Sequence, residues 1–236
     1  CVLDFEATCQ EGSRINPQEI IEFPTVLIEA STMRVVDEFQ SYVRPVHNPK
    51  LTAFCTDLTG IQQQWVERAP VFAEALKQHT EWLQRHGLAV EGAKGHSFLF
   101  VTCGDWDLKT MLPAQLRMER DGRVPAHFRQ WINIKRIYSQ RMPGGGRQAG
   151  GMAGMLRGLG LTLEGRHHSG IDDCRNIAKI VVGLAARGAV LNSTGGSGGG
   201  DGRPAKRSIE HSGTGECQRG RGGVRAHGGG RAHGGG

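Results

Sequence analysis

The sequence predicts an α/β fold, in which helices flank a mixed sheet and a low-complexity tail follows. Three strand-like apolar runs with short links occupy the first 44 residues, which is typical of an antiparallel meander. Beyond them, segments with helical periodicity alternate with a further strand-like run, a pattern typical of helices packed on the faces of a sheet. From residue 195 on, glycine dominates and apolar side chains are almost absent, which predicts disorder.

The predicted strands are apolar runs of strand length that end at turn residues. They cover residues 1–5, 19–30, 35–44 and 97–102. Pro24 lies inside the second run. It indicates a bulge or an edge strand there, because proline has no N–H to donate to a neighbouring strand.

The predicted helices have apolar residues three or four positions apart, and glycines end several of them. They cover residues 51–58, 61–68, 70–86, a segment that begins at Asp105, 152–159 and 171–187. Residues 127–140 fit either kind of element, and we favour a helix there. A glycine-rich loop is expected over residues 143–151.

The chain is predicted to hold one domain over residues 1–190 and a Gly/Arg-rich low-complexity tail over residues 191–236. The stretch from residue 195 contains 17 of the 36 glycines, and it has too little apolar surface to offset the entropy of ordering. The Arg-Gly run at residues 219–223 resembles RNA-binding glycine–arginine tails, which add salt-sensitive affinity. A passive flexible extension is an equal alternative.

Charge and cysteine content restrict the class of protein only loosely. The net charge is +6, of which the tail carries +4, and the remaining +2 does not by itself indicate a nucleic-acid partner. The six cysteines are irregularly spaced and include no Cys-x-x-Cys pair, which favours an intracellular, reducing compartment, cytoplasmic or nuclear. No signal peptide and no apolar run approaching about 18 residues is present, so the sequence supports neither secretion nor a membrane partner. The chain begins at Cys1 inside a strand pattern, which indicates a fragment or a processed chain.

Two carboxylates, Asp4 and Glu6, stand at the end of the first predicted strand. Because side chains two apart on a strand share a face, these two acids face the same way. They repel each other unless a positive charge lies between them, and a hard divalent cation is the natural partner. The alternative is a strand end that turns polar where it reaches solvent.

Two further acids also lie at the ends of predicted strands or helices. Asp107 comes after the fourth predicted strand, and Asp173 lies in the first turn of the last helix, five positions after His168. The alternatives are ordinary: Asp105 or Asp107 can complement a helix dipole, and Asp172 or Asp173 can cap a helix. A histidine in a loop is commonly just solvated.

Taken together, these acids lie where an open sheet gathers its ligands. Four carboxylates suit two Mg²⁺ ions about 3.5–4 Å apart, which clamp the attacking and leaving oxygens of a phosphodiester. Mn²⁺ is expected to substitute. A nearby histidine can take a proton from the attacking water, because its pKa lies near working pH.

Three motifs, in order, resemble those of the DEDDh exonucleases of the DnaQ-like superfamily. They are VLDFEATC at residues 2–9, CGDWDL at 103–108 and HSGIDDCRN at 168–176. The likeness covers roughly residues 1–190 and lies with the eukaryotic branch that contains the 3′ histone-mRNA exonuclease and the enhanced-RNAi exonucleases. It implies an RNase H-like fold with a mixed five-stranded sheet. It also implies a 3′→5′ exoribonuclease that works by a two-metal mechanism and releases nucleoside 5′-monophosphates.

The resemblance also implies roles for single residues. The implied catalytic residues are Asp4, Glu6, Asp107, His168 and Asp173, all but the histidine being metal ligands. Asp107 is chosen over Asp105 because the family's ligand directly follows an aromatic residue, here Trp106. His168 is chosen over His167 because the motif sets His and Asp five apart. Related sequences usually carry proline where this chain has His167, so His167 stays open as a substitute base.

The expected partner is RNA with a free 3′ end, and the oligomeric state stays open. The backbone amides of Ala7 and Thr8 are expected to contact the terminal sugar, whose 2′-hydroxyl would distinguish RNA from DNA. Phe54 and Trp106, with Leu58 beside them, are expected to stack the last base, although they can equally be core residues. Two other functions remain open: a DNA 3′→5′ exonuclease, and a catalytically silent RNA-binding adaptor.

Overall fold

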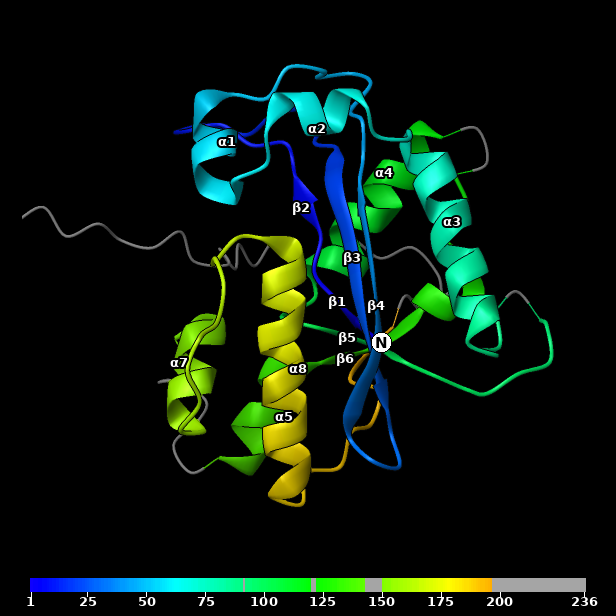
Figure 1. Ribbon diagram of the computed structural model, residues 1–236, viewed down its shortest axis with the longest axis vertical. Helices are drawn as coiled ribbons and strands as arrows, with labels where there is room; N and C mark the ends of the chain where they lie inside the picture. Colours follow the sequence, from blue (N-terminus) through cyan, green and yellow to red (C-terminus); the bar gives the residue numbers. More distant parts are fainter. Residues whose placement is uncertain (91, 120–121, 143–149, 197–236) are drawn as a thin grey trace, which may run out of the picture. The chain divides into compact units, whose positions relative to one another are not determined.

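A computed structural model of the 236-residue chain describes residues 1–90, 92–119, 122–142 and 150–196. The predicted disordered tail from residue 197 on, and most of the predicted glycine-rich loop, lie outside the described residues. All described residues belong to one compact unit. Within it, Figure 1 shows a sheet with helices on both faces, as predicted.

The described residues form one mixed sheet of seven strand segments. The segments are β1 (Val2–Leu3), β2 (Glu6–Ala7), β3 (Ile20–Glu29), β4 (Arg34–Tyr42), β5 (Phe100–Thr102), β6 (Gln130–Asn133) and β7 (Gly195–Gly196). Their order is β2-β3-β1-β5-β6-β7, with β4 paired to β3. The β1–β3 and β3–β4 pairs are antiparallel, as the predicted meander requires, whereas β5 is parallel to both β1 and β6.

The structure has seven strand segments, whereas the resemblance implies a five-stranded sheet, and the difference has two causes. The first predicted strand is split into β1 and β2, because the ladder against β3 is interrupted between Leu3↔Thr25 and Glu6↔Glu22. Pro24, which has no N–H to donate, lies opposite that interruption. It therefore marks a break in the neighbouring strand, while β3 itself is paired on both sides. The second reason is β7, which pairs with β6 inside the predicted tail.

The helix favoured over residues 127–140 is wrong in its first half. Ala126–Phe128 form a 3₁₀ turn, β6 follows, and only Ile134–Arg141 form a helix, α5. A short buried apolar run has no periodicity that separates strand from helix. Pairing with β5, in the register Phe100↔Trp131, makes this run a strand.

The remaining helices lie close to their predicted positions. They are α1 (Ala53–Thr59), α2 (Gln63–Glu67), α3 (Phe72–Arg85), α4 (Leu112–Met118), α7 (Gly151–Gly158) and α8 (Gly170–Ala186). A π-helical turn, Asp107–Met111, runs directly into α4. The Thr52 hydroxyl caps the start of α1, and Gly60 ends it at φ 80°, a conformation that favours glycine. None of the described helices is long and apolar enough to cross a membrane.

Alternating strand side chains build a separate apolar core on each face of the sheet. Leu3 and Phe100 belong to the core that includes α3 residues, whereas their neighbours Val2 and Val101 belong to the core that includes α8 residues. Figure 1 shows α3 on one face and α5, α7 and α8 on the other. Each fully buried large apolar side chain contributes about 1.5–3 kcal/mol.

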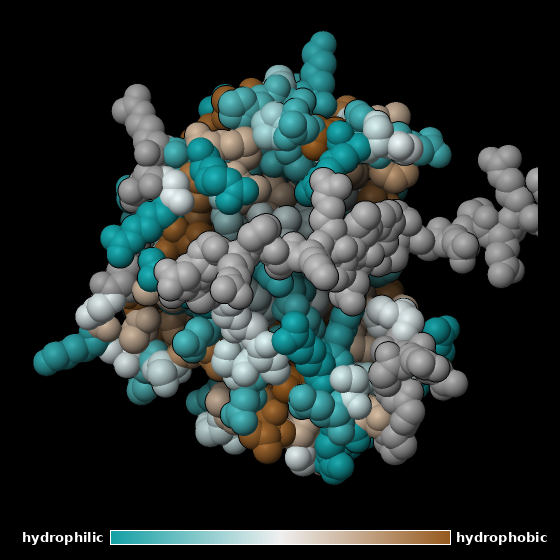
Figure 2. Space-filling model, turned by 180° about the vertical axis from the view of Figure 1, so that it is seen from behind, coloured by the Kyte–Doolittle hydropathy of each residue, from teal (hydrophilic) through white to brown (hydrophobic). Residues whose placement is uncertain are grey.

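The outer surface of the described residues carries few large apolar side chains. Those exposed are Val35, Val36, Val46, Trp65 and Val190. Figure 2 shows hydrophilic and hydrophobic residues interspersed on the face seen from behind. The acids singled out in the sequence lie instead at the carboxyl ends of the parallel strands β1 and β5, where the first residue of α8 is also bonded to β3.

Candidate active site

Two carboxylates stand at the break between β1 and β2. Asp4 follows β1 by one residue, Glu6 opens β2, and both side chains are half-buried. Carboxylate oxygens of Asp4, Glu6 and Asp173 all lie within 4.8 Å of one another. The structure thus brings the first and third predicted motifs together in one place.

The same break in the ladder holds Asp107. The backbone N–H of Phe5, which lies between the two strand segments, donates to Oδ1 of Asp107 at 3.0 Å. Asp107 is 3 % exposed and begins the π-helical turn after β5. It is not a member of the 4.8 Å group. Burial is the main cause that raises the pKa of Asp4, and the negative charge of Asp107 is the next. Asp107 therefore lies beside the other acids and is fixed to the backbone between Asp4 and Glu6.

The four acids are short of positive charge. Burial raises the pKa of Asp107 to about 6 and that of Asp173 to about 7. Burial, and then the negative charge of neighbouring acids, raises the pKa values of Asp4 and Glu6 well above their usual range. Among the described residues, Asp173 Oδ1 is buried and has no hydrogen-bond partner. A divalent cation would supply both the missing charge and the missing partner, so the residues fit one.

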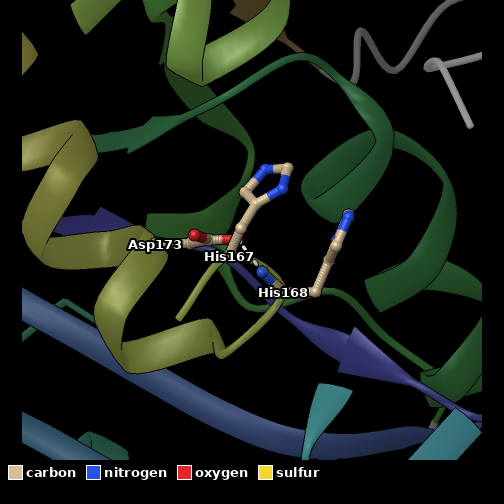
Figure 3. Close-up of side chains that lie close together, drawn as sticks. All are labelled: His167, His168 and Asp173. Atoms are coloured by element: carbon tan, nitrogen blue, oxygen red, sulfur yellow. Dashed lines mark hydrogen bonds between the residues drawn. The ribbon is translucent and has the colours of Figure 1, made fainter. Parts of the chain in front are cut away.

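The loop before α8 is folded onto Asp173. The backbone N–H of His168 donates to Asp173 Oδ2 at 3.0 Å, and the Asp173 N–H donates to the Ser169 carbonyl at 2.8 Å. His168 has φ 66°, in the left-handed region that non-glycine residues seldom occupy. Figure 3 shows the hydrogen bond from the His168 backbone to the carboxylate. The five-residue spacing of the motif is thus the spacing that closes this turn.

Two imidazoles accompany the carboxylate. The rings of His167 and His168 lie 4.0 Å apart between centroids, His167 being exposed and His168 half-buried. One ring nitrogen of each lies within 4.8 Å of the other and of an Asp173 oxygen. Burial lowers the pKa of both, and the charges of His167 and Arg166 lower that of His168 further. Both rings are therefore neutral at neutral pH, as a general base must be, and proximity alone does not choose between them.

The capping role suggested for Asp172 is wrong, and a residue that the sequence analysis missed takes it. Glu22, 1 % exposed on β3, accepts the N–H groups of Gly170 (3.0 Å) and Ile171 (3.2 Å) at the start of α8. Asp172 instead accepts the Arg166 N–H at 2.9 Å. A carboxylate at a helix N-terminus satisfies free N–H groups and the helix dipole. Glu22 therefore ties the helix that carries Asp173 to β3, and its sequence signal was a charge inside an apolar run.

Asp105, the alternative to Asp107, makes contacts of a different kind. Asp105 accepts the indole N–H of Trp131 at 2.9 Å and pairs with Arg136 at 2.8 Å, so its bonds are structural. A second missed residue is Lys135, in the first turn of α5, whose charge lowers the pKa values of Asp4 and Asp107 against the stronger effect of burial. No local sequence pattern marks Lys135, because parallel pairing of β5 with β6 brings it there.

The predicted role of the Thr8 amide is wrong. Its N–H donates to the Glu19 carbonyl at 2.8 Å, and its hydroxyl accepts the Glu19 N–H at 3.0 Å, so the Thr8 amide is already used within the sheet. Thr8 and Ala7 are both buried. Thr8 is therefore a structural residue that extends the β2–β3 pairing.

The proposed base-stacking residues are all half-buried, but they differ in what they pack against. Phe54 and Leu58, four positions apart on α1, are half-buried and belong to neither large core. Trp106 is half-buried and packs against the α3 core, in keeping with the alternative of an ordinary core residue. The Arg166 guanidinium donates to the carbonyls of Asp57 and, at 3.5 Å, Leu58. Arg166 therefore joins the loop that carries His167 and His168 to α1.

Known proteins share this fold and this sequence. The chain matches the family model described as Exonuclease over residues 1–181. It is 47 % identical over 193 residues to ERI1 exoribonuclease 3 of Homo sapiens, which covers 82 % of this chain and 55 % of that relative. The chain thus spans about half the length of the curated relatives it matches.

Two solved structures are also similar. One is the nuclease domain of 3′hExo, a DEDDh family member, bound to rAMP: it is 37 % identical, with a TM-score of 0.76, covering 83 % of this chain and 96 % of that one. The other shows 3′-end specific recognition of histone mRNA stem-loop by a 3′-exonuclease, at 36 % identity and a TM-score of 0.74, covering 81 % and 83 %.

These findings confirm the resemblance of the three motifs to the DEDDh exonucleases, and the similar relatives include exoribonuclease 3. They also confirm the RNase H-like fold. With a family model matching more than half of its length, the chain belongs to the exonuclease family.

Proposed function

We propose that this chain is a metal-dependent 3′→5′ exoribonuclease, which hydrolyses phosphodiester bonds from the 3′ end of RNA and releases nucleoside 5′-monophosphates. The observation that carries the proposal is the cluster of four acids, two of them buried and two half-buried. Oxygens of Asp4, Glu6 and Asp173 lie within 4.8 Å of one another, and Asp107 is bonded to the backbone between the first two. A protein that only bound RNA would have no use for so many uncompensated charges.

We assign Asp4, Glu6, Asp107 and Asp173 as ligands of two Mg²⁺ ions, with Mn²⁺ as a substitute. When bound, such ions stabilise the charge that develops on the attacking and leaving oxygens of a phosphodiester. The protein's own contribution is to hold the acids in place. Phe5 orients Asp107, and the His168 backbone orients Asp173 while leaving its Oδ1 free.

His168 acts as the general base in this proposal. Its lowered pKa keeps the ring neutral, so a ring nitrogen can accept the proton of the attacking water. The loop that carries it is held by Asp173 on one side and, through Arg166, by α1 on the other. His167 is the substitute base if His168 does not serve.

RNA is proposed as the substrate because the similar proteins are named exoribonucleases, and because a solved relative recognises a histone mRNA stem-loop. Phe54 and Leu58, on the half-buried face of α1, are proposed to stack the terminal base, with Trp106 as a further platform. The backbone of Ala7 is proposed to contact the terminal ribose.

An intracellular location, cytoplasmic or nuclear, is part of the proposal. The five cysteines among the described residues are free thiols, which suits a reducing compartment.

The test compares 5′-labelled RNA and DNA oligomers of one sequence, with Mg²⁺, with Mn²⁺ and with EDTA. We expect a ladder that shortens from the 3′ end, on RNA in preference to DNA, and that EDTA abolishes. Asp4→Ala should remove the activity without unfolding the protein, whereas Asp105→Asn, the matched control, should keep it. Preference for DNA would indicate the DNA exonuclease, and RNA binding without cleavage would indicate the silent adaptor.

A further inference from the structure

His167, His168 and Asp173 also meet the requirements of a different metal site. We propose that these three residues bind a transition-metal cation of the Zn²⁺ type, at a site that shares only Asp173 with the ligands of the ions of the proposed reaction. One ring nitrogen of each histidine and one Asp173 oxygen all lie within 4.8 Å of one another. Figure 3 shows both rings extending from the loop that caps Asp173. Two imidazoles and one carboxylate are a common ligand set for Zn²⁺.

A second observation points to a ligand at this place. Asp173 is 4 % exposed, and among the described residues its Oδ1 has no hydrogen-bond partner. Its Oδ2 accepts the His168 N–H at 3.0 Å, which fixes the carboxylate plane. A buried acceptor without a partner destabilises the folded chain, and a bound cation removes that cost.

The loop needs little movement to close on a cation. Zn²⁺ holds nitrogen ligands at about 2.0–2.1 Å, so two ligand atoms of one tetrahedral ion lie about 3.4 Å apart. From separations of at most 4.8 Å, side-chain rotations suffice, because the His167 ring is exposed and the His168 ring half-buried. The backbone is already fixed: the Ser169 N–H donates to the Arg166 carbonyl at 3.2 Å. Three protein ligands leave a fourth position open to water.

The two sites prefer different metals but share one ligand. Imidazole suits Zn²⁺, Co²⁺ and Ni²⁺, whereas Mg²⁺ prefers oxygen ligands. A Zn²⁺ ion bound by the two histidines would withdraw Asp173 from the cluster of four acids, and it would bind a ring nitrogen of the proposed base, His168. It would therefore inhibit the exonuclease. The site itself does not depend on the proposed function, but its inhibitory effect does.

Binding is tested first, without RNA and without Mg²⁺. Zn²⁺ is titrated calorimetrically into the full chain, and Co²⁺ is added separately to record its visible spectrum, which is intense for tetrahedral ions. His167→Ala is the test variant and His47→Ala the control, since both side chains are exposed and every other histidine stays. We expect His167→Ala to weaken Zn²⁺ binding at least about tenfold and to lose the tetrahedral spectrum, because even residues that only orient a ligand cost 10–100-fold.

Equal Zn²⁺ affinity and equal Co²⁺ spectra for wild type and His167→Ala would overturn the proposal. Asp173→Asn should lose the tetrahedral spectrum as well, and its retention would equally overturn it.

Inhibition is measured as the ratio of RNA cleavage with and without Zn²⁺ at fixed Mg²⁺, so that differences in basal rate between variants cancel. We expect His167→Ala to need at least about ten times more Zn²⁺ than wild type or His47→Ala for half-inhibition, in line with the loss of affinity. Equal sensitivity would overturn the inhibitory role. Absence of cleavage with Mg²⁺ alone would refute the proposed exonuclease, and the binding experiment would still decide the metal site.

Discussion

Asp107→Asn removes one buried charge from the cluster of four acids and changes little else. The amide oxygen can still accept the Phe5 N–H, which Asp107 Oδ1 accepts at 3.0 Å. Burial raises the pKa of Asp107 from its usual 3.8 to about 6. Above that pH, the metal-free wild type must carry a buried negative charge that the variant lacks.

The size of the effect follows from linkage. A folded pKa about two above the unfolded one corresponds to about 3 kcal/mol, and the amide's own need for partners reduces the gain to about 1–3 kcal/mol. Because the folded pKa is raised, the stabilisation is complete below the unfolded pKa and is lost as pH rises through about 6. For a domain of this size, the variant should melt about 2–12 °C above wild type at about pH 8.

Thermal unfolding, followed by circular dichroism, tests this at about pH 5 and about pH 8. In EDTA at the higher pH, Asp107→Asn should melt above wild type. At the lower pH, which lies between the unfolded and the folded pKa of Asp107, the difference should fall to about half. Saturating Mg²⁺ should raise the melting temperature of the wild type more than that of the variant, because a ligand at about 100 times its dissociation constant stabilises the wild type by about 2.7 kcal/mol. The variant, which lacks one ligand charge, should gain less.

Asp105→Asn is the matched control. Burial raises the pKa of Asp105, but hydrogen bonds, first among them the one from Trp131, lower it by more, so that the net shift is downward. Removing this charge should therefore destabilise the protein with or without Mg²⁺. The reasoning is refuted if Asp107→Asn is no more stable than wild type in EDTA at about pH 8. It is also refuted if Mg²⁺ raises the melting temperature of the variant as much as that of the wild type.

Three further predictions address the base, the α8 cap and the tail. His168→Ala should lower turnover about 10²–10⁴-fold with little change in Mg²⁺ binding; a larger loss for His167→Ala in the same single-turnover assay would move the base to His167. Glu22→Gln should lower the free energy of unfolding by about 1–3 kcal/mol and weaken Mn²⁺ binding, because it disturbs the acceptor of the Gly170 N–H. Glu29→Gln, on the exposed end of the same strand, is its control, and equal melting of the two would contradict the capping role. Deletion of residues 197–236 should leave the catalytic rate unchanged and at most weaken RNA binding at low salt; a lost rate would contradict this.

Much of the fold could be predicted because its local patterns agree with its packing. The meander of β3 and β4, the amphipathic helices and the acids at strand ends all carry their signal within a few residues. Pro24 shows the limit of predicting structure from local sequence patterns. The sequence marked it as a disturbance in its own strand, yet the break lies in the neighbouring strand, at Asp4 and Phe5.

The rest depends on pairings between distant segments. The strand β6 could not be separated from a helix by its three buried residues, and only its pairing with β5 decides. Glu22 meets Gly170 across 148 positions, so no local pattern could assign it the capping of α8. The Thr8 amide was expected to be free because the length of β2–β3 pairing was not visible in the sequence.

The most direct test of the account is the anomalous scattering of Mn²⁺ in crystals of this protein soaked with a nucleoside 5′-monophosphate. We predict two anomalous peaks about 3.5–4 Å apart, in contact with carboxylate oxygens of Asp4, Glu6, Asp107 and Asp173. A single peak without Asp107, or no peak between these four side chains, would contradict the two-cation centre on which the proposed function depends.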